Sequence, residues 1–186
     1  MSGKGVKIKT NTIKSKAELV EWVYSESTDW NVFGTLKLRS GDKGKNENDI
    51  LRFNRQQRLV KAAKHYFNLI DKVFYNNLVH RKNIRVERIV FLQSGITGRN
   101  EHLHFIAKSA FKNTEEFCCL LKAIWEGCIR ESSSRSEFEI VDNNFAIANY
   151  LTHEYGKLQN DTFETMTTHI NAEEVEMISD TSKVKM

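Results

Sequence analysis

Two short apolar segments, Arg88-Ile-Val-Phe-Leu-Gln93 and Glu101-His-Leu-His-Phe-Ile-Ala107, decide the fold. Both are rich in β-branched and aromatic residues, and a glycine-containing connection separates them, which predicts two strands joined as an antiparallel hairpin. Residues two apart in a strand point to the same side, so His102 and His104 should share one face. In such a hairpin Gln93 falls roughly opposite His102. The segments therefore predict two imidazoles and one amide on a single face of a sheet.

This set of donors suits a hard divalent cation. Neutral imidazoles and an amide oxygen leave several coordination positions open, and Mg²⁺ or Mn²⁺ would fill these positions with water and a phosphate oxygen. A His-apolar-His strand also occurs on the wet face of any half-exposed antiparallel sheet. The hairpin alone is compatible both with a metal site and with an ordinary solvent-facing strand, and the motifs in the surrounding segments favour one of the two.

The segments before the hairpin predict two helices and one strand. Ser15-Lys-Ala-Glu18 is a capping box that opens a short helix over 17–24. The alternating, β-rich stretch 30–38 predicts a strand, and a polar loop follows it. Apolar residues then recur at spacings of three and four from about residue 49 to residue 78, which predicts a long helix.

The segments after the hairpin predict a helix, a strand and a last helix. Asn113 caps a helix with one apolar stripe, the stretch 137–141 reads as a strand, and Asn143 or Asn144 can cap a helix over 145–157. The expected fold class is α+β. The order of elements is close to the ferredoxin-like, split βαβ arrangement, with a small antiparallel sheet and helices mainly on one face.

The composition indicates one domain of a cytosolic protein. The chain has 186 residues, of which 40% are hydrophobic, and no apolar run is long enough to span a bilayer. The charged N-terminal stretch has no apolar segment behind it, so we expect no secretory signal. Cys118, Cys119 and Cys128 contain no Cys-x-x-Cys pair, which favours reduced thiols in the core of an intracellular protein.

The formal net charge of +4 is distributed unevenly. Five lysines and no acidic residue occupy the first sixteen residues, whereas six acidic residues and two lysines follow residue 159. We therefore expect a basic flexible arm over 1–16, a folded domain over 17–158 and an acidic, disordered tail over 159–186. A basic arm suits phosphate contacts, although a solvated terminus with no such role is an equally good interpretation.

Three short motifs follow one another on separate predicted elements. They are Phe33-Gly-Thr-Leu36, then Gln93 with His102-Leu-His104, then Tyr150 with His153 and Lys157. In this combination and order the chain resembles the HUH endonuclease superfamily, and especially the rolling-circle replication initiators of small viruses and plasmids. The resemblance spans roughly residues 30–157, and it rests on the joint order of the motifs because no single one is specific.

The resemblance implies a reaction and a set of ligands. In that family an upstream Glu or Gln on the neighbouring strand supplies the third metal ligand, so Gln93, His102 and His104 would bind Mg²⁺ or Mn²⁺. Tyr150 would attack a phosphate of single-stranded DNA, which leaves a 5′-phosphotyrosine link and a free 3′ hydroxyl. Tyrosine hydroxyls titrate near pKa ~10, so the attack needs help from a nearby cation.

The third motif departs from the family's pattern. His153 stands where the family often has lysine, and Lys157 lies two turns beyond Tyr150 on the same helical face, from which it could supply the charge. We include His153 and Lys157 among the catalytic candidates. Tyr155 is the competing nucleophile, and we favour Tyr150 because the residues around it match the family's spacing better. A tyrosine that merely packs its helix on the sheet is the structural alternative.

Contacts to DNA are expected from polar and basic side chains near these motifs and from the arm. The candidates are Thr35, Lys37, Arg88, Arg99, Lys7 and Lys9, with Arg85 as a further phosphate contact. Basic side chains of this kind would hold the sugar–phosphate backbone and would not read the bases.

The sequence thus predicts a metal-dependent, site-specific single-strand DNA nickase and strand transferase that starts rolling-circle replication at an origin. Relaxases and single-tyrosine transposases use the same chemistry and remain alternatives. Another is a non-catalytic module for single-stranded nucleic acid, in which Phe91 and Phe105 would stack on bases. The chain has no Gly-x-x-x-x-Gly-Lys-Ser/Thr loop, so unwinding would need a separate helicase or an origin that is already open. The expected location is cytoplasmic, or inside the host cell for a viral protein, with no membrane partner.

Overall fold

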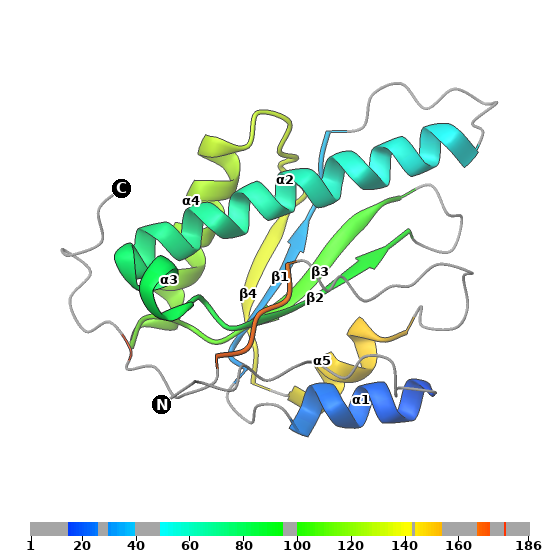
Figure 1. The fold of residues 1–186 in the computed structure, drawn as a ribbon. Helices are drawn as coiled ribbons and strands as arrows, with labels where there is room; N and C mark the ends of the chain where they lie inside the picture. Colours follow the sequence, from blue (N-terminus) through cyan, green and yellow to red (C-terminus); the bar gives the residue numbers. More distant parts are fainter. Residues whose placement is uncertain are drawn as a thin grey trace.

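The computed structural model describes residues 15–25, 30–39, 49–94, 100–142, 144–153, 167–171 and 177. Within these residues, one sheet contains the strands β1 (Val32–Leu36), β2 (Arg88–Gln93), β3 (His102–Ala107) and β4 (Glu137–Ile140). The helices of the same residues are α1 (Lys16–Ser25), α2 (Asp49–Tyr75), α3 (Asn77–Lys82), α4 (Thr114–Cys128) and α5 (Asn144–Leu151). Figure 1 shows α2 and α4 on one side of the sheet and α1 and α5 on the other.

The strands follow one another across the sheet in the order β2-β3-β1-β4, and each neighbouring pair is antiparallel. Because β1 and β2 both pair with β3, they run parallel to each other, and the chain reaches β2 from β1 through α2 and α3. The expected α+β class with a small antiparallel sheet is confirmed.

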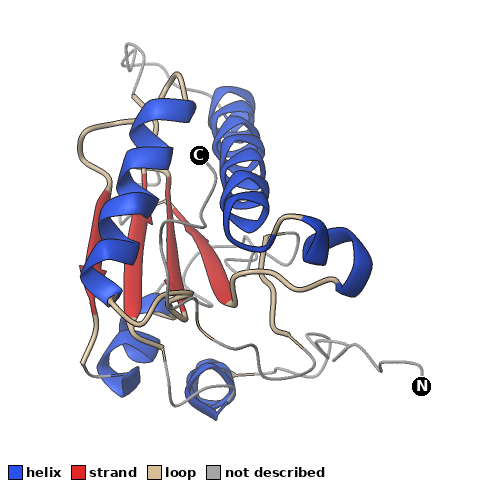
Figure 2. Ribbon diagram, turned by 90° about the vertical axis from the view of Figure 1, so that its left-hand side faces the viewer, coloured by secondary structure: helices blue, strands red, loops and turns tan. Residues whose placement is uncertain are grey.

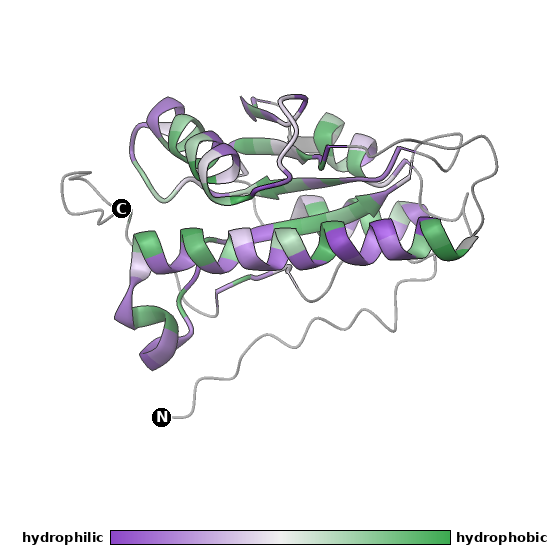
Figure 3. Ribbon diagram, turned by 90° about the horizontal axis from the view of Figure 1, so that it is seen from above, coloured by the Kyte–Doolittle hydropathy of each residue, from purple (hydrophilic) through white to green (hydrophobic). Residues whose placement is uncertain are grey.

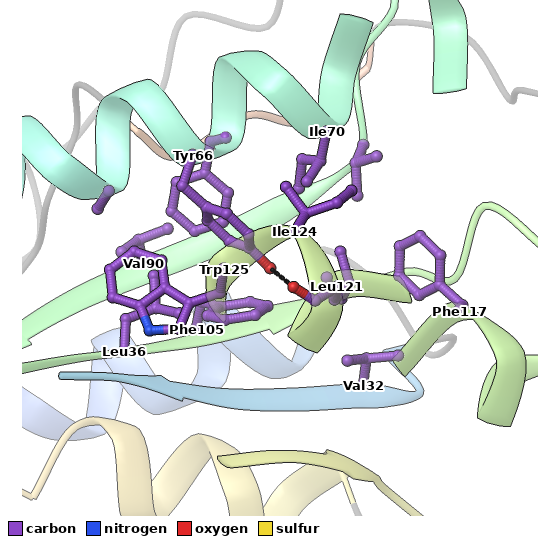
Figure 4. Close-up of a cluster of buried hydrophobic side chains, with 14 of the residues drawn as sticks. Val32, Leu36, Tyr66, Ile70, Val90, Phe105, Phe117, Leu121, Ile124 and Trp125 are labelled. Atoms are coloured by element: carbon purple, nitrogen blue, oxygen red, sulfur yellow. Dashed lines mark hydrogen bonds between the residues drawn. The ribbon is translucent and has the colours of Figure 1, made fainter. Parts of the chain in front are cut away.

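The larger core lies between the sheet and the pair α2 and α4. Side chains alternate along a strand, so Leu36 on β1 and Phe105 on β3 face this side and are fully buried. Tyr66 of α2 is buried among them, and its hydroxyl donates a hydrogen bond of 3.1 Å to the carbonyl oxygen of Leu121 in α4 (Figure 4). This bond satisfies a buried polar group and fixes α2 against α4. Hydrophobic and hydrophilic residues alternate along α2, as expected for a helix with one buried side (Figure 3).

A second core lies on the opposite face of the sheet, beneath α1 and α5. It contains Val23 of α1, Phe33 of β1, Ile106 of β3 and Ala148 of α5. The expectation that helices lie mainly on one face holds for α2, α3 and α4 but not for α1 and α5, and Figure 2 shows helices on both sides of the strands. The reason is that β1, β2 and β3 carry large apolar side chains on both faces, and a second helix layer is needed to bury them.

The long predicted helix ends earlier than its apolar periodicity suggests. α2 stops at Tyr75, and Asn76 takes a backbone φ of 42° before α3 begins at Asn77. Asparagine adopts positive φ more readily than most residues, so a helix can be interrupted there without glycine. The interruption lets α3 turn away from the axis of α2.

Residues 167–171, in the region expected to form an acidic tail, lie along the edge strand β2. The backbone N–H of Arg88 donates to the carbonyl oxygen of His169 at 2.8 Å, and the N–H of His169 donates back to Arg88 at 2.9 Å. This short segment covers part of an edge that would otherwise present unpaired backbone groups. In the described part of the chain no helix has the length and apolarity that crossing a membrane requires.

Gly34 is a position on β1 where a side chain cannot be accommodated. A Cβ atom at this residue would lie 2.2 Å from the ring of Phe105, which is itself fully buried on β3. We predict that Gly34→Ala lowers the free energy of unfolding by about 1–3 kcal/mol, because the ring has no space into which to move. The midpoint of urea denaturation measures this loss.

Gly127 in α4 provides the matched control. A Cβ atom there meets nothing within 4 Å. Gly127→Ala should therefore raise the free energy of unfolding by up to about 1 kcal/mol, as expected for a helical glycine. Equal effects of the two substitutions would contradict the packing of Phe105 over Gly34.

Candidate active site

The two histidines lie where the hairpin was expected to place them. In the register of β2 and β3, Gln93 is paired with His102, and in the register of β1 and β3, Thr35 is paired with His104. The rings of His102 and His104 are 4.5 Å apart, centroid to centroid, and meet edge to face. The three strands thus gather the polar side chains on the face that α1 and α5 partly cover.

Each imidazole has its ring orientation set by a hydrogen bond at Nδ1. In His102 this nitrogen donates to the carbonyl oxygen of Asn100 at 2.6 Å, because a carbonyl can only accept. In His104 the same nitrogen lies 3.0 Å from the Thr35 hydroxyl oxygen. A proton held at Nδ1 leaves the lone pair at Nε2, which is the arrangement that a metal-binding histidine needs.

His104 is neutral over the whole physiological range. Burial is the main cause, and the neighbouring charges of His102, Lys37 and His153 add to it, so that its pKa falls from 6.5 to about 2. Its Nε2 atom is buried, and it has no hydrogen-bond partner among the described residues. A neutral imidazole with an unpartnered buried nitrogen is chemically suited to coordinate a cation.

Gln93 connects the histidine face to α5. Its amide nitrogen donates a hydrogen bond of 2.7 Å to the carbonyl oxygen of Leu151, the last residue of α5. Carbonyls at the end of a helix lack a partner within the helix, so this bond fixes α5 in place. The other atom of the amide, Oε1, is buried and has no partner among the described residues. The Gln93 side chain therefore positions α5 through its amide nitrogen, and its amide oxygen can act as a metal ligand.

Tyr150 projects from α5 over the histidine pair. Its ring lies 5.2 Å from the ring of His104 and 5.9 Å from that of Phe33. The ring of His153 stacks on the ring of Tyr150, with 5.3 Å between the two centroids. The Nδ1 atom of His153 donates a hydrogen bond of 2.6 Å to the backbone carbonyl oxygen of Tyr150. Tyr150 is 49% exposed, so this residue is accessible from solution. Tyr150 thus contacts two other predicted site residues, His104 and His153.

A cavity of about 590 Å³ opens in front of these residues. Besides the histidines and Tyr150, it is lined by Lys37 after β1 and by two carboxylates of β4, Glu137 and Glu139. Sequence reasoning missed the carboxylates. The signal was present in the alternation Glu-Phe-Glu, which places both on one face of a strand, but nothing in the sequence showed that β4 lies beside β1.

Thr35 and Lys37, two of the expected DNA contacts, have different surroundings. Thr35 is buried at the lining of the cavity, and its hydroxyl is bonded to His104, so it holds the imidazole ring in place. Lys37 is partly exposed and lines the cavity. The first motif thus contributes Phe33 and Thr35 to the site, and Lys37, one residue after the motif, also lines the cavity.

Arg88 does not belong to the site. It is 3% exposed on the other face of the sheet, where its guanidinium makes a two-pronged ion pair with Asp71 at 2.7 and 2.9 Å and lies over the ring of Phe67. Arg85 bonds the same carboxylate at 3.0 Å. A guanidinium held in this way is not available to a phosphate, so we exclude Arg88 from the DNA contacts. On a strand its residue number has the opposite parity to the site-facing Gln93, which is how the error could have been found.

We predict that Arg88→Ala destabilises the protein by about 3 kcal/mol or more, because it removes the main partner of a carboxylate that has no exposure to solvent. The free energy of unfolding from urea denaturation measures this. Arg81→Ala is the control, since Arg81 is exposed on α3 and should change stability by less than about 0.5 kcal/mol. A tolerated Arg88→Ala would show that the pair with Asp71 has no structural role.

Five other candidates, Lys7, Lys9, Arg99, Lys157 and the competing nucleophile Tyr155, lie outside the described residues. Their roles stay predictions.

The residues on the histidine face fit a divalent cation by their chemistry. His104 Nε2 and Gln93 Oε1 lie on neighbouring strands, and both are buried atoms with no hydrogen-bond partner in the part of the chain that the structure describes. His102 completes the set of candidate ligands. No cluster of three or more His, Cys, Asp or Glu side chains in the described ranges is placed to bind a metal. The candidate here is of another kind, since it combines two histidines with an amide.

The sequence matches no protein-family model, and neither a curated protein nor a solved structure is significantly similar to it.

Proposed function

We propose that the protein is a metal-dependent endonuclease that nicks and rejoins single-stranded DNA through a covalent bond to Tyr150, as the initiators of rolling-circle replication do. The observation that carries the proposal is the contact between Tyr150 and the histidine face. The ring of Tyr150, a residue that is 49% exposed, lies 5.2 Å from the ring of His104, whose Nε2 is buried and has no hydrogen-bond partner among the described residues. A nucleophile and a candidate cation site therefore border the same cavity.

The reaction would be a transesterification. The Tyr150 hydroxyl oxygen attacks the scissile phosphorus, the bond from phosphorus to the 3′ oxygen breaks, and that oxygen takes up a proton to become a hydroxyl. The tyrosine proton passes to solvent or to a neighbouring base. Because one phosphoester bond replaces another, the reaction consumes no external energy source. The same steps in reverse rejoin the strand, since the phosphotyrosine bond stores the energy of the phosphodiester.

His102, His104 and Gln93 would hold the divalent cation, Mg²⁺ or Mn²⁺. When bound, it would polarise the scissile phosphate and stabilise the negative charge on the leaving oxygen. His153 stacks on Tyr150 and so fixes the direction of the phenol, while Lys37 at the rim of the cavity would bind a phosphate oxygen.

The topology supports a ferredoxin-like, split βαβ fold for this domain. The strand order β2-β3-β1-β4 favours this proposal, because β1 and β2 flank β3 and a helical connection joins them. An enzyme of this kind would act on a replication origin inside a cell and would need a separate helicase, or DNA that is already open.

The non-catalytic alternative loses the feature that favoured it. Phe91 and Phe105, which would have stacked on bases, are completely buried in the two cores and face helices. Base stacking needs aromatic rings that a nucleic acid can reach. The exposed aromatic ring at the cavity belongs to Tyr150, which is the proposed nucleophile.

A covalent-adduct experiment tests the proposal. Full-length protein is incubated with single-stranded DNA of mixed sequence and Mn²⁺, and the products are analysed by denaturing electrophoresis and by mass spectrometry of proteolytic fragments. We expect a metal-dependent adduct whose DNA-derived mass lies on the peptide that contains Tyr150. Cleavage without any adduct would indicate hydrolysis by water and would contradict the proposal.

A further inference from the structure

A second cavity, of about 300 Å³, lies between the end of β1, the first half of α2 and the loop before β4. The cavity is notable for its charge. Five cationic side chains line it, against the single carboxylate of Glu101. The cations are Lys37, Arg39, Arg55, Arg58 and Arg135. A concave surface lined by one sign of charge concentrates the electrostatic potential and attracts ions of the opposite sign.

Several of the arginines are held in place by defined partners. Arg55 makes a two-pronged ion pair with Glu101, at 2.7 and 3.0 Å, and this carboxylate is only 6% exposed. Arg39 donates its Nε–H to the carbonyl oxygen of Ser132 at 3.0 Å, which uses one of the five N–H donors of a guanidinium. Arg58 pairs with Glu131 at the surface. The Arg39 guanidinium is therefore oriented before a ligand arrives, which lowers the entropy lost on binding, whereas Arg55 and Arg58 are already paired with carboxylates.

The basic cavity and the cavity of the candidate active site share two lining residues. Lys37 and Asn100 contribute to both. Lys37 follows β1, and Asn100 precedes β3, so the two cavities meet at the same end of the sheet. An extended polymer with one negative charge on each monomer could pass from one cavity into the other across Lys37 and Asn100.

We propose that the basic cavity binds backbone phosphates of the single-stranded DNA whose scissile phosphate lies at Tyr150. The inference rests on the proposed function, and it adds a second binding region that is separate from the histidines. Arginine recognises phosphate through parallel N–H donors. Arg39, Arg135 and Lys37 are the cations that would bind the phosphates, because Arg55 is already paired with Glu101 and Arg58 with Glu131. Leu38 and Leu59, which also line the cavity, give it an apolar wall for a sugar ring.

The test compares two doubly substituted proteins that lose the same charge. Arg39→Gln with Arg135→Gln removes two exposed guanidinium groups from the cavity. Arg81→Gln with Lys112→Gln removes two exposed charges from the surface at α3 and before α4. Fluorescence anisotropy with a labelled thymidine oligonucleotide is measured over a range of salt concentrations in the presence of EDTA, so that binding is recorded without cleavage.

We expect the cavity variant to bind the oligonucleotide more weakly and to reduce the slope of log K against log salt by about 1 relative to the wild type. The control variant should leave both within error. Identical behaviour of the two variants would overturn the assignment. Titration with thymidine monophosphate supplies a further arm. If the monophosphate binds and depends on Arg39 and Arg135, but oligonucleotide binding does not, the cavity is a site for free nucleotides and the proposal is wrong.

The outcome is independent of the chemistry at Tyr150. If the wild type forms no adduct but the cavity variant shows the reduced salt slope, the DNA-binding cavity is supported and the proposed reaction is contradicted. If the wild type forms the adduct but the two variants bind DNA alike, the proposed reaction is supported and the role of the cavity is contradicted.

Discussion

Replacing His102 and His104 together by alanine should abolish both Mn²⁺ binding and DNA cleavage while the protein stays folded. The two rings are the paired donors of the proposed site, and His104 Nε2 has no other partner in the described residues. Isothermal titration with Mn²⁺ measures the first effect, and the adduct assay measures the second. We expect no measurable heat of Mn²⁺ binding and a fall in the cleavage rate of at least about 10³-fold, because the proposed metal ion stabilises the charge on the leaving oxygen.

The control for this experiment is a second pair of histidines. His65 on α2 and His80 on α3 are exposed and lie outside both cavities. His65→Ala with His80→Ala removes the same atoms, and it should leave Mn²⁺ binding and cleavage unchanged. Circular dichroism and the urea midpoint show whether either double variant has lost its fold, since His102 and His104 are buried and their truncation also removes packing.

Two further substitutions grade the effect. Thr35→Val removes the hydroxyl that contacts His104 Nδ1 and should weaken Mn²⁺ binding by about 10- to 100-fold, as the loss of an orienting partner does in other metal sites. Gln93→Ala should weaken it less, because a water molecule can replace a neutral oxygen ligand. Unchanged Mn²⁺ affinity in the His102→Ala, His104→Ala protein would disprove the site.

The histidine face could be predicted from the sequence because short-range rules decide it. The alternation of side chains along β3 and the short connection to β2 are local properties, and they place His102 beside His104 and Gln93 opposite His102. The caps of two helices are local as well. Ser15 and Asn113 accept the backbone bonds expected of them, Ser15 from Glu18 and Asn113 from Glu115 and Glu116.

The second helix layer and the neighbours of β4 could not be predicted, because they depend on packing between distant segments. α1 and α5 are far apart in the sequence, yet they pack together over the same face of the sheet. Glu137 enters the cavity because β4 pairs with β1, and no local pattern selects that neighbour. The burial of Arg88 likewise depends on its ion pair with Asp71 of α2. The apolar periodicity of α2 does not show which of the charged residues on the helix is buried.

Tyr150→Phe should bind DNA and Mn²⁺ as the wild type does but form no covalent adduct. The substitution removes one oxygen atom from a ring that is 49% exposed, and the ring contacts with His104, Phe33 and His153 remain. The free energy of unfolding should therefore change by less than about 0.5 kcal/mol. The cleavage rate should fall by about four orders of magnitude or more, as happens when a nucleophile is removed from other enzymes. Quantitative gel analysis of a labelled oligonucleotide measures the rate.

The matched substitution is Tyr155→Phe, five residues further along the chain. We expect it to cleave at the wild-type rate, because the proposed nucleophile is Tyr150, whose ring contacts His104. An active Tyr150→Phe with an inactive Tyr155→Phe would reassign the nucleophile and keep the covalent mechanism. If the two single variants and the double variant all cleave, tyrosine is not the nucleophile. The histidine face would then have to serve attack by water, and a 5′-phosphotyrosine could not be the intermediate, because neither phenol would be available to form it.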